Sequence, residues 1–160
     1  MQLTESNRSF FQQCLSELAA NKDVQSMDTF IQHGDVSTLE HSVSVAFVSL
    51  WLSEKLNWHV DRSSLVRGAL LHDFFLYDWH VGNGQKGLHG FTHPRTALEN
   101  AEARFQLTER ERNIILRHMW PLTPIPPKYR EAYLVSVADK YCSLVETLRK
   151  HTVYQYKKSE

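Results

Sequence analysis

The chain has nine histidines among 160 residues, and one of them begins a pair of side chains that readily bind metal ions. His72 and Asp73 directly follow the apolar run Gly68–Leu71. Burying an imidazole and a carboxylate without partners is costly, so an apolar helix needs a reason to end in both. Together they suit a divalent ion such as zinc, iron or manganese. Neighbours on a helix point about 100° apart, so one side chain would bind a first ion while the other reaches across it or bridges to a second.

Two further residues extend this pair to a constellation. His41 lies on the apolar face of an earlier predicted helix, and Asp139 follows Val137 and Ala138 in a late one. Taken singly, His41 would be a hydrogen-bonded core histidine and Asp139 a salt-bridged acid. Metal sites inside helical bundles collect ligands from distant helices, so the three positions together favour a divalent-metal site.

The elements that must position these residues are helices. Apolar residues recur at spacings of three and four, whereas strand alternation is hard to find. Capping boxes at Ser37–Glu40 and Thr108–Glu111 mark two helix starts. We predict an all-α fold with helices over 5–20, 38–56, 61–74, from Thr92-His93-Pro94 onward, 108–118 and from Lys128 to about 151, with a short helical turn over 27–33, a loop over 75–91 and irregular chain over Pro121–Pro127.

Length and composition indicate one ordinary domain. We expect residues 1–160 to form it, with a core over about 34–150 and a frayed tail over 151–160. Acidic and basic residues balance at 18 each, which gives no field that would attract nucleic acid or an anionic membrane. Met1–Arg8 lacks the apolar stretch of a signal peptide, and Cys14 and Cys142 are isolated thiols, so we expect a cytoplasmic protein.

The order of these residues resembles that of a known family. A histidine, a His-Asp pair after a small apolar run, and a late aspartate in an Ala-Asp-Lys context are similar to the HD superfamily of metal-dependent phosphohydrolases, over roughly Gly34 to Glu146. The resemblance implies a single HD-type helical bundle of about six or seven helices. The HD-x-G-K continuation of some members is absent, since Phe74 and Phe75 follow the motif, which argues against a lysine-assisted mechanism and against close kinship to the HD-GYP cyclic-dinucleotide enzymes.

Two more histidines extend the resemblance to the two-metal subgroups. His93-Pro94-Arg95-Thr96-Ala97 resembles their His-Pro-x-x-Gly segment, with Ala97 in place of glycine, and His118 resembles their next ligand. His89 is the alternative to His93, but the proline favours His93. By this analogy Asp73 would bridge two ions, and His72 and Asp73 would be catalytic. The implied metal ligands are His41, His72 and Asp139 on one ion, His93 and His118 on the other, and the shared Asp73.

The resemblance also implies an activity. We expect a phosphohydrolase that uses two divalent transition-metal ions (iron or manganese first, then zinc, nickel or cobalt) on a nucleotide-like phosphoester or phosphoanhydride. The small bacterial dinucleoside-tetraphosphate hydrolases are similar in ligand order and size. Arg95, Lys140 and His33 are the candidate substrate-binding residues, and aromatic residues near the motif could stack a base.

Two other functions remain open at this stage. Diiron oxygenases of the superfamily share the ligand order, so the ligands alone do not separate hydrolysis from oxygen chemistry. A non-catalytic nucleotide sensor would not need six ligands. For either enzyme we expect a small phosphorylated substrate as the partner, without nucleic acid or membrane, and leave a homodimer open.

Overall fold

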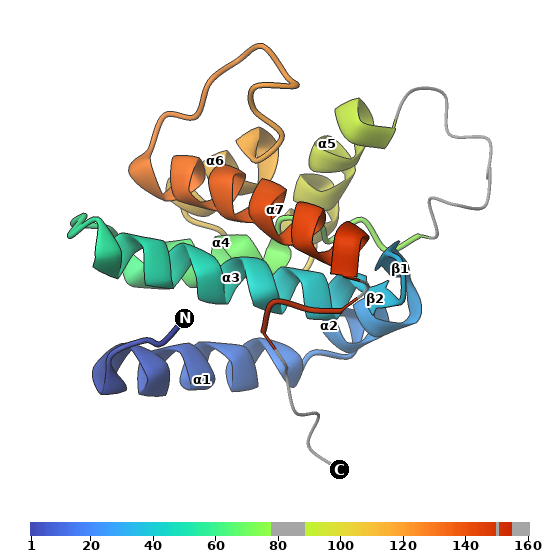
Figure 1. Cartoon of the computed structure of the whole chain (residues 1–160). Coiled ribbons are helices and arrows are strands. Elements are labelled where there is room, and N and C mark those ends of the chain that lie inside the picture. The colour runs from blue at the N-terminus through green and yellow to red at the C-terminus, as the bar shows by residue number, and fades with distance from the viewer. Residues whose placement is uncertain (78–88, 150, 155–160) are drawn as a thin grey trace.

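A computed structural model describes residues 1–77, 89–149 and 151–154 of the chain. It confirms the predicted all-α class (Figure 1). The helices are α1 (Glu5–Ala19), α2 (Lys22–Ser26), the 3-10 helix η1 (Met27–Thr29), α3 (Thr38–Lys55), α4 (Arg62–Leu71), α5 (His89–Glu102), α6 (Glu109–Arg117) and α7 (Arg130–Arg149), and the two short strands are β1 (Ile31–His33) and β2 (Val36–Ser37).

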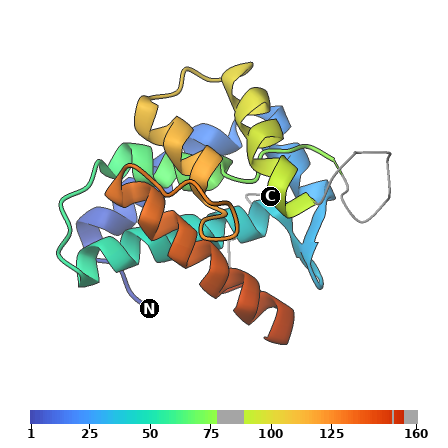
Figure 2. The same ribbon diagram turned by 90° about the horizontal axis from the view of Figure 1, so that it is seen from above.

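Helix α3 forms the centre of the bundle. From Thr38 to Leu50 every residue except Glu40 is buried, because this stretch is apolar or small on all sides. Helices α1, α4 and α7 pack around it (Figures 1 and 2). A residue that points inward from α3 therefore lies close to α4 and α7, and this is the position of His41.

The two predicted capping boxes are present and determine where α3 and α6 begin. Ser37 Oγ accepts from the amide of Glu40 at 3.2 Å, and Glu40 Oε2 accepts from the amide of Ser37 at 3.1 Å. Thr108 and Glu111 make the same reciprocal pair at 3.2 and 2.7 Å. Each box satisfies two amides that a helix start leaves unpaired, so it fixes the phase of the turns that follow.

A glycine allows α4 and α6 to approach closely. A Cβ added at Gly68 would lie 2.6 Å from Cδ1 and 3.1 Å from Cβ of Ile114. Both residues are buried, in helices that end one turn later. Their close approach brings the ends of the two helices together, and these ends carry His72, Asp73 and His118.

Several local predictions differ from the structure, and helix α4 ends at Leu71 instead of near Phe74. Residues 27–33 are helical only over η1, and Ile31–His33 pairs with β2 in an antiparallel hairpin whose turn uses Gly34 at φ 59°. Helix α5 begins at His89 and not at Thr92, so Pro94 lies inside it and removes one backbone donor. The predicted loop is therefore helical from His89 on, and its residues 78–88 lie outside the described ones.

Part of the predicted frayed tail packs against the core. The Tyr154 ring stacks on Phe47 with centroids 4.4 Å apart and meets Phe11 edge-on at 5.6 Å. The Tyr154 amide also donates to Ser44 Oγ at 3.2 Å. An aromatic ring thus anchors residues 152–154, whereas 150 and 155–160 lie outside the described residues.

The outer surface of α7 is unusually apolar. Its inner face buries Ala132, Val135 and Ala138, whereas Val137 and Leu144 on the outer face are 57% and 60% exposed. This apolar character does not make α7 a membrane span. Across the described ranges, no helix has the length and apolar composition needed to cross a bilayer.

We expect Gly68→Ala to destabilise the fold by about 1–3 kcal/mol, because the added methyl group meets Ile114 at less than van der Waals distance. Urea unfolding measures this cost. Ile114→Val removes the Cδ1 atom closest to the new methyl group, so Gly68→Ala should cost less in that background. An equal cost in both backgrounds would show that the α4–α6 contact is not the cause.

Candidate metal centre

Six metal-competent side chains, contributed by five helices or the residues that directly follow them, converge in the bundle. His41 comes from the first turn of α3, His72 and Asp73 from the residues after α4, His93 from α5, His118 from the C-cap of α6 and Asp139 from α7. All six are buried, and Asp139 is the most exposed at 7%. These are the six residues predicted as ligands, and the fold brings all of them together.

The histidine rings are oriented by acceptors behind them. Nδ1 of His72 donates to the carbonyl of Ala69 at 2.7 Å, and Nδ1 of His118 donates to the carbonyl of Ile115 at 2.8 Å. Because a carbonyl only accepts, the proton of each neutral ring is on Nδ1, and Nε2 presents its lone pair to the centre. This is the tautomer that a metal-binding histidine requires.

One half of the centre contains His41, His72, Asp73 and Asp139. Asp73 Oδ2 lies 3.4 Å from His72 Nε2 and 3.9 Å from His41 Nε2. Asp139 Oδ1 lies 3.2 Å from His41 Nε2 and 3.8 Å from His72 Nε2. Each of these two imidazole nitrogens thus lies within 3.9 Å of an oxygen of both aspartates.

The other half contains His93, His118 and the second oxygen of Asp73. The Nε2 atoms of His93 and His118 are 2.8 Å apart. Asp73 Oδ1 lies 3.2 Å from the first and 3.5 Å from the second. The two oxygens of a single carboxylate therefore face different pairs of histidines.

The donor set fits divalent metal ions. Two groups, His41/His72/Asp73 and Asp73/His93/His118, each bring their ligand atoms within 4.8 Å of one another. His72 Nε2 and Asp73 Oδ1 are buried and form no hydrogen bond with any residue that the structure describes. Each such orphaned atom costs about 1–3 kcal/mol, a cost that coordination would remove. Imidazole and carboxylate ligands suit zinc, iron and manganese.

Burial and neighbouring charges set the protonation of the centre. Burial lowers the pKa of His41, but its contacts with Asp139 and Glu146 outweigh burial and raise the pKa to about 10. Burial and the nearby His72 lower the pKa of His118 to about 3. Burial raises the pKa of Asp73, but the surrounding imidazoles outweigh it and hold that pKa far below its usual range.

Two residues of the centre were missed by sequence reasoning. Glu146 is fully buried, and its Oε2 accepts from His41 Nδ1 at 2.7 Å. It lies two turns after Asp139 on the same face of α7, a spacing that could have indicated it. Gln32 Nε2 donates to Asp73 Oδ2 at 2.6 Å. Nothing local distinguished Gln32, because its contact depends on how the hairpin docks.

The predicted substrate-binding residues have different surroundings. Arg95 is exposed on α5, two residues after His93. Lys140 is tied to the protein, since its Nζ donates to the carbonyls of His118 and Ser136 at 3.1 and 3.2 Å. The side chains of His33 and of the alternative ligand His89 lie outside the described residues.

We expect Glu146→Leu to weaken metal binding about 10- to 100-fold, because it removes the carboxylate that orients His41. Glu146→Gln keeps an acceptor for His41 Nδ1 and should weaken metal binding less. Chelator competition measures both affinities, with Glu99→Gln on the exposed face of α5 as the control. Equal affinities in the wild type and Glu146→Leu would exclude this role.

We expect metal affinity to rise by about tenfold per pH unit between about pH 6.5 and 8.5, because an ion must displace one proton from His41. Below 6.5 the raised pKa of His41 stabilises the metal-free fold fully, and this stabilisation is lost as pH rises toward 10. Calorimetric titration in buffers of different ionisation enthalpy counts the released proton. The exposed His151→Ala variant should behave as the wild type, and pH-independent affinity would contradict this assignment.

Comparison with known proteins agrees with this geometry. The model of the HD domain family matches residues 38–144. This span begins at the first residue of α3 and includes all six converging side chains. No curated protein and no solved structure matches the chain. Because the match extends over most of its length, the chain belongs to the HD-domain family, the superfamily of metal-dependent phosphohydrolases.

Proposed function

We propose that the protein is a phosphohydrolase that holds two divalent transition-metal ions, iron or manganese first, and cleaves a phosphoester or phosphoanhydride of a small nucleotide-like molecule. The observation that carries this proposal is the position of Asp73. Its Oδ2 faces His41 and His72, and its Oδ1 faces His93 and His118. A carboxylate shared in this way is the arrangement that two neighbouring ions require.

The proposed ligands are His41, His72, Asp73 and Asp139 for one ion and Asp73, His93 and His118 for the other. When bound, such ions lower the pKa of a water molecule and neutralise charge on phosphoryl oxygens. The protein contributes orientation and exclusion of bulk water. Gln32 fixes the Asp73 carboxylate, Glu146 fixes the His41 ring, and the ligands are almost fully buried.

Side-chain exposure and aromatic contacts support a proposed access route and substrate class. Asp139 and His93, at 7% and 4% exposed, are the most accessible of the six side chains, so we propose that the phosphate enters on their side. Arg95 would then meet it. An aromatic row leads away from His93, whose ring meets Phe75 edge-on at 5.9 Å, and Phe75 contacts Tyr77 at 4.9 Å. Phe75 is buried, so the partly exposed Tyr77 ring is the member of this row that supports a substrate with a flat base.

We expect protein purified without chelators to contain about two iron, manganese or zinc ions per chain. A panel of nucleotide and sugar phosphates should then identify one from which it releases phosphate under strict anaerobiosis. The His72→Ala/Asp73→Ala double variant should lose both metal and turnover. Metal-free wild type would refute the proposal, oxygen-dependent turnover would indicate an oxygenase, and bound metal without turnover would indicate a sensor.

Two matched variants test the number of ions within the same experiment. His93→Ala and His118→Ala remove ligands from one half only, so each should lose about one ion and retain the other. Elemental analysis of the folded variants measures the loss. Loss of both ions from either variant would show that the six residues form a single site.

A further inference from the structure

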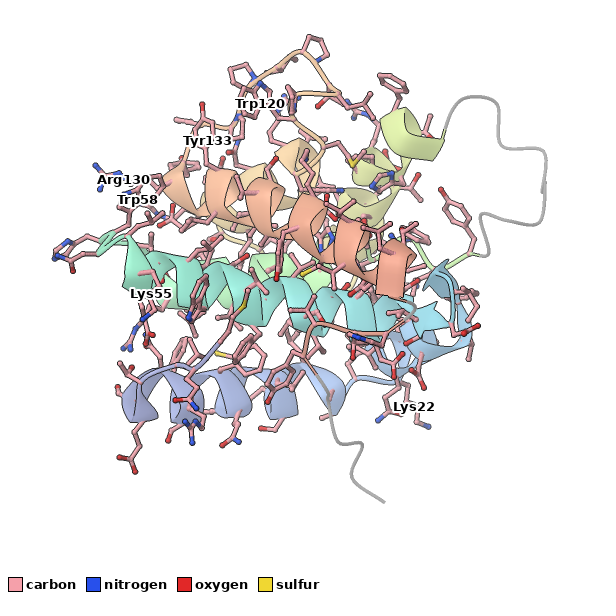
Figure 3. The ribbon with its side chains drawn as sticks, viewed as in Figure 1. Lys22, Lys55, Trp58, Trp120, Arg130 and Tyr133 are labelled. Carbon is pink, nitrogen blue, oxygen red and sulfur yellow. The ribbon has the colours of Figure 1, made fainter. Side chains whose placement is uncertain are left out.

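The turn that follows His118 is clamped to α7 by three contacts. Lys140 Nζ donates to the carbonyl of His118 at 3.1 Å, and Ser136 Oγ donates to the carbonyl of Trp120 at 2.7 Å. The Trp120 ring meets the Tyr133 ring edge-on at 5.6 Å, and the two lie beside each other above α7 (Figure 3). The turn residues that make these contacts are His118 itself and Trp120, two positions later.

The three α7 residues of this clamp share one face of the helix. Tyr133, Ser136 and Lys140 follow one another at spacings of three and four, the spacing that stacks side chains along a helix. Asp139 directly precedes Lys140 on α7. Helix α7 therefore carries the predicted ligand Asp139 and also holds the turn that contains the predicted ligand His118. The clamp therefore links the two halves of the metal centre through the backbone.

The Lys140 ammonium already donates all of its hydrogens to oxygens of the protein. It has three donor hydrogens, and three oxygens accept from it, namely the carbonyls of His118 and Ser136 and Ser136 Oγ at 3.1 Å. The carbonyl of His118 also lies at the C-terminal end of α6, where a positive charge is favoured by the helix dipole. To bind a substrate phosphate, Lys140 would have to give up these oxygens.

We propose that Lys140 is a positioning residue, which holds His118 against α7 and so controls occupancy of the ion position formed by Asp73, His93 and His118. This inference rests on the proposed two-ion function. The His118 ring is bonded to its own helix through the Ile115 carbonyl, so a shift of this helix end moves Nε2 with it. His41 and His72 have separate supports, in Glu146 and the Ala69 carbonyl, and should keep their ion.

Stepwise titration of the metal-free full chain with Mn²⁺, followed by electron paramagnetic resonance, tests this role. Lys140→Met keeps the aliphatic stem and removes the ammonium, which also lies 4.0 Å from Asp139 Oδ2. We therefore expect second-ion affinity about 10- to 100-fold weaker and first-ion affinity changed by far less, because no hydrogen bond to Asp139 is lost. Lys140→Arg, which retains donors, should recover part of the loss. Lys55→Met removes the same charge at the far end of α3, labelled in Figure 3, and should match the wild type.

Other outcomes would overturn the proposal in different ways. Two ions of unchanged affinity in Lys140→Met, with orthophosphate binding to the loaded protein weakened, would make Lys140 a phosphate-binding residue. Comparable weakening of both ions would contradict the selective effect. If Lys140→Met does not fold by circular dichroism, Ser136→Ala, which removes one hydroxyl of the clamp, should weaken the second ion alone. A wild type that binds no Mn²⁺ would instead refute the proposed function.

Discussion

The carboxylate of Asp73 is buried where side chains from five helices converge, and the surrounding structure compensates for taking that charge out of water. Four imidazoles and one amide face it, and all of them except the adjacent His72 come from segments distant in sequence. An isolated ionised carboxylate in such a place would be strongly unfavourable, so its neighbours have to be positive ions or polar donors. The close α4–α6 contact at Gly68, the helix starts at Ser37 and Thr108, and the docking of the hairpin are all needed to supply them together.

The hydrogen-bond acceptors that orient the histidine rings are of two kinds, local and distant in sequence. His72 and His118 donate hydrogen bonds to carbonyls of their own helices, so local structure orients these rings. His41 donates a hydrogen bond to Glu146, a carboxylate 105 positions later in the chain. Its orientation therefore depends on how α7 packs on α3, whereas the other two depend on how their helices end. In this arrangement, packing α7 on α3 and orienting His41 for metal binding are the same event.

The helices with strong local signals could be predicted from sequence. Both capping boxes act between residues three apart, so their contacts follow from the chain itself. The six convergent side chains were also predicted, because their order resembles that of a family with known ligands. Gln32 and the role of Lys140 could not be predicted, since both depend on contacts across 41 and 22 residues. The start of α5 was misplaced because Pro94 was taken as a first-turn residue, although the helix tolerates its missing donor one turn later.

His41 and Asp139 touch across a separation of 98 residues. An ion held between them would act as a reversible cross-link that closes nearly the whole bundle. Since only the folded chain brings these ligands together, metal availability and folding are linked equilibria. At a free-ion concentration 100 times the dissociation constant, the folded state gains about 2.7 kcal/mol. The lifetime of this protein in a cell would then depend on the supply of the ion as well as on its own sequence.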